Sequence, residues 1–235
     1  MTTADNVRLA PGSVKICGLR TPKHAGAAAL AGADLIGFVF ADDRRRVTPD
    51  EAAASIKAAR MAAGCRRLIA VGVFVNESAE TINAVVETAG LDLVQLQGDE
   101  DPGMIGELSR PVVKALRLPP GGTVRDAEET IARYQDTRNS PVAYLIDGYD
   151  PSHYGGQGVR ADWDLAKELA HGHPVMLAGG LDGVNVGQAI RHVQPHGVDV
   201  SSGVEIDGVK DIAKITAFVD AAKSEFKRSV TWGIQ

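Results

Sequence analysis

The feature that most constrains the fold is a regular alternation of short aliphatic runs with longer stretches rich in Ala, Glu, Lys and Arg. This alternation is typical of βαβ units, in which helices join parallel strands. Eight such units favour a closed barrel over an open sheet, because closure removes both sheet edges. We therefore predict an α/β protein, a single-domain (β/α)8 TIM barrel. Its predicted strands are Val14–Cys17, Leu35–Phe40, Leu68–Val75, Leu93–Gln97, Val112–Arg117, Ala143–Asp147, Val175–Ala178 and Val198–Ser201.

Helix-boundary signals flank the segments between these strands. Thr21-Pro22, Thr48-Pro49 and Ser78 precede alanine-rich stretches, where a capping hydroxyl satisfies a free N–H group and a first-position proline removes one. Three glycines follow the stretches at positions where a left-handed residue commonly ends a helix. They are Gly32, Gly64 and Gly90.

The length and composition fit one domain. The chain has 235 residues, 44% hydrophobic and only 5% aromatic, so it can bury a large aliphatic core. No linker or low-complexity segment interrupts the series of strands. We predict an N-terminal extension over residues 1–13, the barrel domain over 14–226 and a tail over 227–235, in which Trp232 is a candidate to dock on the barrel.

Charge and cysteine usage exclude several classes of protein. The net charge is −5 and the 25 basic residues are scattered, which argues against nucleic-acid binding. The N-terminus has no apolar signal region, and no stretch approaches the roughly 18–20 apolar residues of a membrane helix, so we expect a cytoplasmic protein without membrane partners. Cys17 and Cys65 lie far apart and outside any metal-ligand spacing, so we predict no metal site.

Polar groups gather at the ends of the predicted strands. In a TIM barrel the C-terminal strand ends form the functional face, and here they carry Cys17, Asp147 and Asp199. Strand alternation places Lys15 on the same face as Cys17. We therefore hypothesise that the Lys15 ammonium favours the thiolate of Cys17.

Glycine-rich ends of neighbouring strands predict a phosphate site. Each glycine alone fits an ordinary turn, but glycines also let backbone N–H groups approach an anion closely. Phosphate sites of TIM barrels commonly lie after strands seven and eight. The predicted cradle comprises Gly156 and Gly158 after strand six, Gly179 and Gly180 after strand seven, and Ser202 and Gly203 after strand eight.

An ordered series of short motifs spans Val14 to Glu205: VKICG, GFVF followed by RRVTP, VGVFVN, VQLQGDE, KALR, LIDG, YGGQG, LAGGL and VDVSSGVE. The series resembles the phosphoribosylanthranilate isomerase family. That resemblance implies an Amadori rearrangement of N-(5-phosphoribosyl)anthranilate to 1-(2-carboxyphenylamino)-1-deoxyribulose 5-phosphate, the third step from chorismate to tryptophan. It implies no cofactor and a small phosphorylated substrate as partner. Because the surface helices of a barrel can be either solvated or paired, we expect a monomer or a homodimer.

The chemistry needs an acid to open the ribose ring and a base to remove a proton from the neighbouring carbon. By resemblance, Cys17 is the general base, Asp147 is the general acid, and Asp199 is a supporting hydrogen-bond partner. Three neighbouring arginines, Arg44, Arg45 and Arg46, are candidates to bind the anthranilate carboxylate. By resemblance the family's arginine corresponds to Arg45, with Arg46 as a substitute because the preceding loop is one residue short, and at least one of the three is expected to be a solvated surface charge. Gln97 stands where the family more often has histidine.

Plainer and competing interpretations exist. A lone buried cysteine is usually structural, and Asp147-Gly148 also fits a turn. A histidine-pathway aminoaldose isomerase would carry an Asp where this chain has Cys17. Indole-glycerol-phosphate synthase would need a Lys and Glu set that the sequence does not supply. A non-catalytic phosphate-binding barrel would bind its ligand without Cys17 or Asp147.

Overall fold

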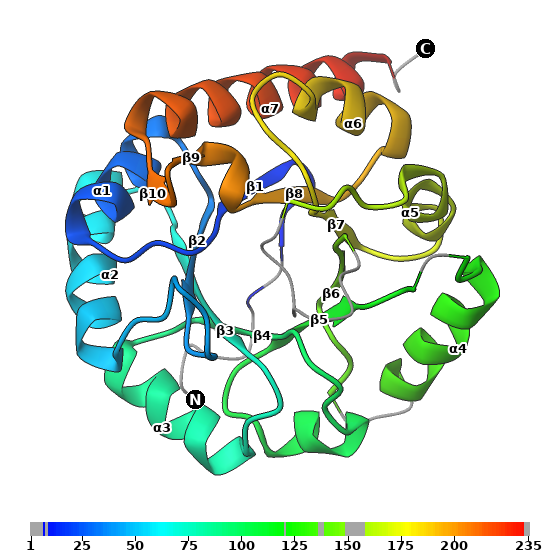
Figure 1. Cartoon of the computed structure of the whole chain (residues 1–235), viewed down its shortest axis with the longest axis horizontal. Coiled ribbons are helices and arrows are strands. Elements are labelled where there is room, and N and C mark those ends of the chain that lie inside the picture. Colours follow the sequence, from blue (N-terminus) through cyan, green and yellow to red (C-terminus); the bar gives the residue numbers. More distant parts are fainter. Residues whose placement is uncertain (1–6, 8, 120, 136–138, 149–157, 233–235) are drawn as a thin grey trace.

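A closed parallel barrel forms the centre of the molecule. The structure is a computed structural model that describes residues 7, 9–119, 121–135, 139–148 and 158–232. Eight strands pair in sequence order, β1 closes on β8, and helices surround the ring (Figure 1). The predicted (β/α)8 barrel is confirmed.

The strands are shorter than predicted at their functional ends. Each predicted strand ran one residue past the last paired residue of the observed strand. Cys17 and Asp147 are two of these additional residues. The observed strands are β1 Ser13–Ile16, β2 Leu35–Val39, β3 Ile69–Phe74, β4 Leu93–Leu96, β5 Val112–Leu116, β6 Ala143–Ile146, β7 Val175–Leu177 and β8 Gly197–Val200.

The outer layer contains α1 Pro22–Ala31, α2 Pro49–Ala63, α3 Ala79–Ala89, α4 Val124–Gln135, α5 Trp163–Ala170, α6 Val186–Val193 and α7 Ile212–Trp232, with the 3-10 helix η1 Pro102–Glu107 between β4 and β5. The predicted N-caps Thr21, Thr48 and Ser78 accept hydrogen bonds from backbone N–H groups of their helices. Of the predicted left-handed stops, Gly32 and Gly90 are left-handed. Gly64 is not, because its φ of 61° is combined with a ψ of −122°.

Two apolar layers hold the barrel together. Outward-facing strand residues such as Val14 and Ile16 pack against the helices. Inward-facing residues such as Leu35 and Val71 fill the lower barrel, where Val7 and Leu9 from the N-terminal segment join them. The interior is therefore a packed core below the polar rim.

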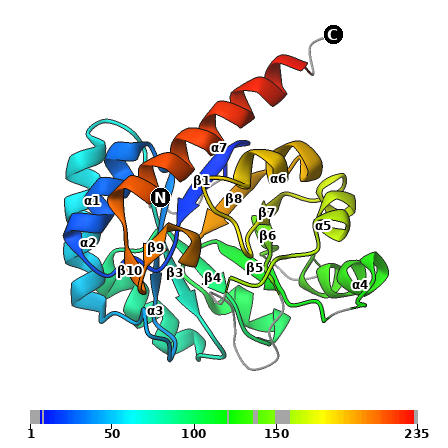
Figure 2. The ribbon, with the colours of Figure 1, turned by 45° about the horizontal axis from the view of Figure 1, so that its top comes forward.

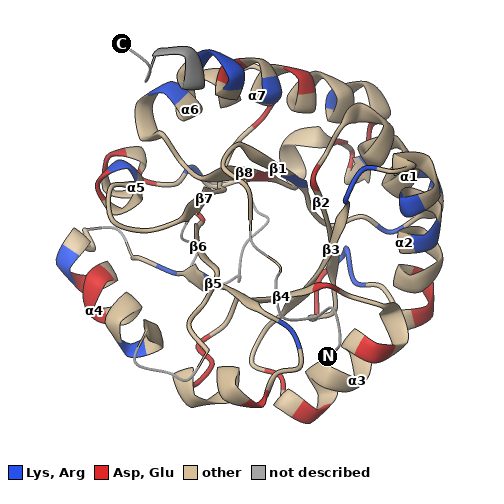
Figure 3. Cartoon of the chain, turned by 180° about the vertical axis from the view of Figure 1, so that it is seen from behind, with Lys and Arg blue, Asp and Glu red and all other residues tan. Residues whose placement is uncertain are grey.

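The C-terminal helix extends beyond the predicted domain boundary. α7 runs to Trp232, and its end projects from the barrel in Figure 2, so residues 227–232 are helical rather than frayed. The structure does not describe the Trp232 side chain, so its docking on the barrel stays a prediction. Basic and acidic residues are interspersed around the helical ring in Figure 3. Within the described ranges, no helix is long and apolar enough to cross a membrane.

A hairpin that we did not predict follows β8. The 3-10 helix η2 Ser202–Val204 leads into β9 Glu205–Ile206, which pairs antiparallel with β10 Val209–Lys210. The connecting Asp207-Gly208 has φ values of 48° and 77°, as a two-residue hairpin turn requires. This short hairpin places Glu205 and Lys210 beside the rim of the barrel.

Candidate active site

One pocket opens at the C-terminal ends of the strands. Its volume is about 460 Å³, within the range of roughly 300–1,000 Å³ for small-molecule sites. Apart from Gly156, which lies outside the described residues, and Gly203, every candidate site residue lines it. These lining candidates are Cys17, Arg45, Arg46, Asp147, Gly158, Gly179, Gly180, Asp199 and Ser202.

Cys17 lies beside a buried ion pair. Lys15 Nζ donates to Cys17 Sγ at 3.4 Å and to Asp199 Oδ2 at 2.9 Å, and strand pairing sets Lys15 opposite Asp199. Burial disfavours the Lys15 ammonium, but Asp199 and Cys17 outweigh it, and the pKa of Lys15 is raised. Burial also raises the pKa of the Cys17 thiol, and the nearby Lys15 ammonium only partly offsets it. The ammonium thus favours the thiolate as hypothesised, but burial is the larger effect.

Asp147 follows β6 on the same pocket. Burial raises its pKa from 3.8 to about 6, although hydrogen bonds from Gly148 and Gln97 act in the opposite direction. Gly148 N–H donates to Asp147 Oδ1 at 2.8 Å, and Gln97 Nε2 donates to Oδ2 at 3.2 Å. A carboxyl in this environment can hold a proton near neutral pH, as a general acid must.

Two glutamines connect the aspartate with the lysine. Lys15 Nζ donates to Gln95 Oε1 at 2.6 Å, and Gln95 Nε2 donates to Gln97 Oε1 at 2.6 Å. Gln97 then contacts Asp147, as described above. Gln95 and Gln97 are buried and share the inward face of β4 because they are two residues apart.

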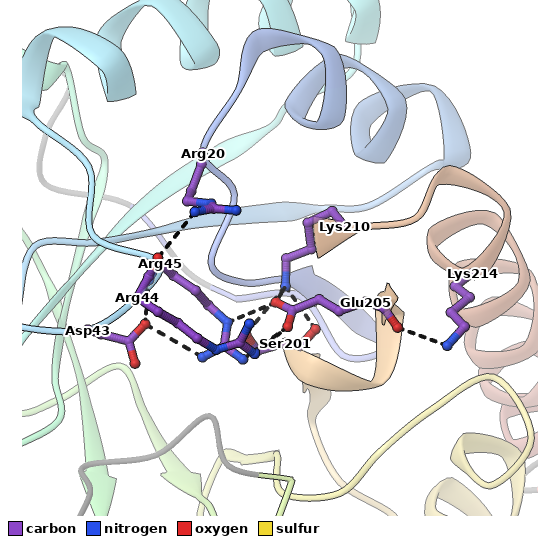
Figure 4. Close-up of polar contacts among 8 residues, drawn as sticks. All are labelled: Arg20, Asp43, Arg44, Arg45, Ser201, Glu205, Lys210 and Lys214. Carbon is purple, nitrogen blue, oxygen red and sulfur yellow. Dashed lines mark hydrogen bonds and ion pairs between the residues drawn. The ribbon is translucent and has the colours of Figure 1, made fainter. Parts of the chain in front are cut away.

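The buried arginine lies in a charged cluster around Glu205 (Figure 4). Arg45 Nε donates to Glu205 Oε1 at 2.8 Å and its Nη2 donates to Oε2 at 3.1 Å. Lys210 Nζ donates to Glu205 Oε1 at 2.8 Å, and Arg44 Nη2 donates to Oε2 at 2.6 Å. Burial would raise the pKa of Glu205, but hydrogen bonds from Arg45 and the charge of Lys210 lower it to about 2.

The three neighbouring arginines have different environments. Arg45 is 2% exposed, and its stem lies against Gly18, where a Cβ would overlap the Arg45 Cδ. Arg44 reaches the outer side of Glu205 and is half exposed. Arg46 is exposed at the pocket mouth, where its side chain makes no hydrogen bond with any described residue. The structure thus separates a buried, oriented arginine from two at the surface.

The described glycine-rich ends of β6, β7 and β8 lie close together. A Cβ at Gly158 would lie 3.2 Å from Ser202 Oγ, and one at Gly180 would lie 3.1 Å from Gly158 O. Gly179 and Gly180 have φ values of 79° and 64°. At Gly203 a Cβ would overlap the Leu181 carbonyl oxygen. Short approach distances therefore explain why these positions lack side chains.

Sequence reasoning missed three residues of the site: Gln95, Glu205 and Lys210. The alternation of β4 could have indicated Gln95, since it shares a face with Gln97. Glu205 is the last residue of the VDVSSGVE motif. Asp207-Gly208 is a typical hairpin turn, and this hairpin brings Lys210 to Glu205. In the described part of the chain, no group of three or more His, Cys, Asp or Glu side chains is arranged to hold a metal ion.

Comparison with known proteins decides the family. A family model described as N-(5′-phosphoribosyl)anthranilate (PRA) isomerase matches residues 14–221. The chain belongs to this family. The N-(5′-phosphoribosyl)anthranilate isomerase of Roseiflexus sp. (strain RS-1) is 47% identical over 215 residues, covering 90% of this chain and 98% of that protein.

Solved structures of the family have the same fold. The phosphoribosyl anthranilate isomerase of Thermotoga maritima superposes with a TM-score of 0.76 at 32% identity, covering 90% of this chain and 98% of that one. A structure in complex with reduced 1-(o-carboxyphenylamino)-1-deoxyribulose 5-phosphate gives a TM-score of 0.73, with the same identity and coverage. The chain is thus an aldose–ketose isomerase of tryptophan biosynthesis. The histidine-pathway and non-catalytic interpretations are set aside.

Proposed function

We propose that this protein catalyses the Amadori rearrangement of N-(5-phosphoribosyl)anthranilate with Cys17 as general base and Asp147 as general acid. Asp147 protonates the ribose ring oxygen, which opens the ring to an imine. Cys17 as thiolate removes the proton from the neighbouring carbon and gives an enolamine. The enol proton then moves to the former imine carbon to give the aminoketose, and Cys17 releases a proton to water while Asp147 regains one. One observation carries the assignment: the only two predicted acid–base groups open onto the same pocket from β1 and β6.

The phosphate would lie among the glycine-rich ends of β6, β7 and β8. Gly158, Gly179 and Gly180 together with Ser202 line that part of the pocket and bring backbone close to a bound anion. Gly156 and Gly203 belong to the same proposed cradle, with Gly203 packed behind it. The solved complex with a phosphorylated product analogue in a relative at 32% identity supports this substrate class.

The anthranilate carboxylate would bind Arg45. Arg44, Arg45 and Lys210 face two carboxylates, Asp43 and Glu205, so three positive charges meet two negative charges. A bound carboxylate would balance the cluster. Glu205 orients the Arg45 guanidinium through two hydrogen bonds, which limits the entropy lost on binding.

Arg46 would assist at the pocket mouth as a solvated charge.

Asp199 would support the substrate through its second oxygen. Its Oδ1 is buried and accepts no hydrogen bond from any described residue, whereas Oδ2 accepts from Lys15. An unpaired buried acceptor is unfavourable, so a substrate hydroxyl or amine donating to Oδ1 would be stabilised. Asp199 thus fits a supporting hydrogen-bond partner rather than the acid or the base.

The test is turnover of the anthranilate adduct, followed by the loss of its fluorescence. Wild type should turn over, and Cys17→Ala and Asp147→Asn should each lose roughly 10²–10⁴-fold or more in kcat, as expected for a missing base or acid. Cys65→Ala is the control for loss of a thiol, because Cys65 is exposed and lies outside the pocket. A wild-type protein that binds the substrate without converting it would contradict the proposal.

The quaternary structure stays a prediction of a monomer or a homodimer. One solved relative, from Thermotoga maritima, is described as the monomer form of a dimeric isomerase. The described site residues of one protomer gather around a single pocket, with Gly203 packed behind it, so we expect activity to be independent of association. Turnover per protomer, measured over a range of protein concentrations, checks this expectation.

A further inference from the structure

The buried residues Lys15, Gln95 and Gln97 form a hydrogen-bonded chain that ends at Asp147. The Lys15 ammonium can donate three hydrogen bonds and can accept none. Three acceptor atoms of neighbouring residues lie within reach of Nζ. They are Cys17 Sγ at 3.4 Å, Gln95 Oε1 at 2.6 Å and Asp199 Oδ2 at 2.9 Å. Each of the three N–H groups of Lys15 therefore has an acceptor.

A lysine at the start of this chain determines the direction of every bond in it. Because Lys15 can only donate, Gln95 must present its oxygen to Lys15 and its NH2 group to Gln97. Gln97 must then accept through Oε1 and present its own NH2 group to Asp147 Oδ2. No amide can reverse alone, because a reversed glutamine would place two donors or two acceptors against each other.

At Asp147 this direction fixes where a proton can lie. Oδ1 accepts from the Gly148 N–H, and Oδ2 accepts from Gln97. Neither partner can accept a proton from the carboxyl. A proton on Asp147 must therefore occupy a lone pair that faces neither of them, and because Asp147 lines the pocket, a substrate oxygen can reach it there. At Cys17, likewise, Lys15 donates to Sγ, so the S–H bond of the thiol must point away from Lys15.

We propose that Lys15, acting through Gln95 and Gln97, is the positioning residue that directs the exchangeable protons of Asp147 and Cys17 toward the substrate. This inference rests on the proposed function, since it concerns the same acid and base. It assigns to Lys15, Gln95 and Gln97 a role in orienting the protons of Cys17 and Asp147 through hydrogen bonds, without any proton transfer of their own. It also gives Gln97 a specific task, because an amide at this position transmits the direction set by Lys15.

The variant Gln95→Glu should reverse the second half of the chain. A glutamate at this position still accepts from Lys15, but its other oxygen needs a donor, so Gln97 must turn its NH2 group toward it. Gln97 then presents its oxygen to Asp147, which can bond to it only by donating its own proton. The acid proton is thus diverted away from the substrate.

Two readouts separate this effect from a general electrostatic one. The added negative charge and the lost N–H donor should both raise the pKa of Asp147 above about 6. If the charge acted only through the pKa of Asp147, more of the acid form would be present at pH 8 and kcat would rise. The same charge beside Lys15 would also raise the pKa of Cys17, so the pH dependence of Cys17 alkylation is measured as well and kcat is compared at equal thiolate fractions. Diversion of the proton predicts the opposite, a loss of kcat of at least about tenfold at pH 8, as part of the 10²–10⁴-fold contribution of a general acid. KM should change little, because the proposed phosphate and carboxylate sites are untouched.

The experiment needs controls, because other charged groups also face Asp147 and line the pocket. Gln188→Glu, on the exposed face of α6, is the matched control for an added carboxylate, and we expect its kcat to equal that of wild type. If Gln95→Glu does not fold, Gln95→Met cuts the chain without reversing it and should lower kcat severalfold. The charged groups facing Asp147 are Lys15 from β1 and Asp199 from β8, with Asp42, Asp43, Arg45, Arg46 and Glu77 around the pocket.

The experiment measures kcat and KM at pH 6 and pH 8, together with the 13C carboxyl titration of Asp147 by NMR without substrate. A raised Asp147 pKa with a lower kcat at pH 8 in Gln95→Glu supports the proposal. An unchanged titration, or a kcat at pH 8 equal to or above that of wild type, overturns it while leaving the isomerase assignment intact. An inactive wild type would refute the proposed function instead, and the titration would still test the direction of the chain.

Discussion

Replacing Asp147 by Asn should change the free energy of unfolding by an amount that depends on pH. Burial raises the pKa of this carboxyl from 3.8 to about 6, so the folded protein keeps a proton that the unfolded chain releases. The folded state therefore loses stability as pH rises through this window, and the loss is complete above pH 6. The penalty is about 1 kcal/mol at pH 4.5 and about 3 kcal/mol at pH 8. The asparagine side chain does not ionise, so the variant escapes this penalty.

The measured quantity is the difference between the variant and wild type at the two pH values. An asparagine cannot satisfy the donors of both Gly148 and Gln97, which costs the variant about 1 kcal/mol at either pH. This constant cost cancels, and the pH-dependent gain of about 2 kcal/mol remains. Urea unfolding at pH 4.5 and pH 8 measures it, with Asp220→Asn on the exposed face of α7 controlling for loss of a negative charge. A change below about 0.5 kcal/mol would refute the raised pKa.

Three further outcomes are expected. Lys15→Met should raise the pKa of Cys17 further, because the ammonium partly offsets burial; the pH dependence of alkylation by iodoacetamide measures it, and an unchanged titration would contradict the role of Lys15. Glu205→Gln should raise KM roughly tenfold with a smaller effect on kcat, because Arg45 loses the charged hydrogen-bond partner that orients it, an interaction of about 1.4 kcal/mol or more. Equal changes in KM and kcat would mean that Glu205 does not act through substrate binding. Gly203→Ala should lower thermal stability by several degrees in a melting scan, because its Cβ would overlap a backbone carbonyl; an unchanged melting temperature would mean that this loop readily moves.

Much of the fold could be read from local patterns. The eight strands and the caps Thr21, Thr48 and Ser78 follow from hydrophobic period and from hydrogen bonding within a few residues. Gly64 shows the limit of this reasoning. Its place after a helix predicted a positive φ, which it has, but its ψ depends on the path of the following loop.

The sequence contains a local signal for the hairpin after β8, but it does not show which residues the hairpin contacts. Asp207-Gly208 is a typical hairpin turn, yet only the folded barrel shows what the hairpin contacts. It brings Glu205 to Arg45, 160 residues earlier in the chain, and Lys210 to the same carboxylate. Such a pairing cannot be derived from spacing.

The sequence by itself determined the fold class, the position of the functional rim and the identity of Cys17 and Asp147 as candidates, because strand period and short motifs are local properties. The tertiary structure decided how these groups are tuned. Lys15 meets Gln95 across 80 residues and Asp199 across 184, and burial rather than any neighbour in sequence raises the pKa values of Cys17 and Asp147. Desolvation and charge pairing depend on all surrounding elements at once, so they exist only when the barrel has closed.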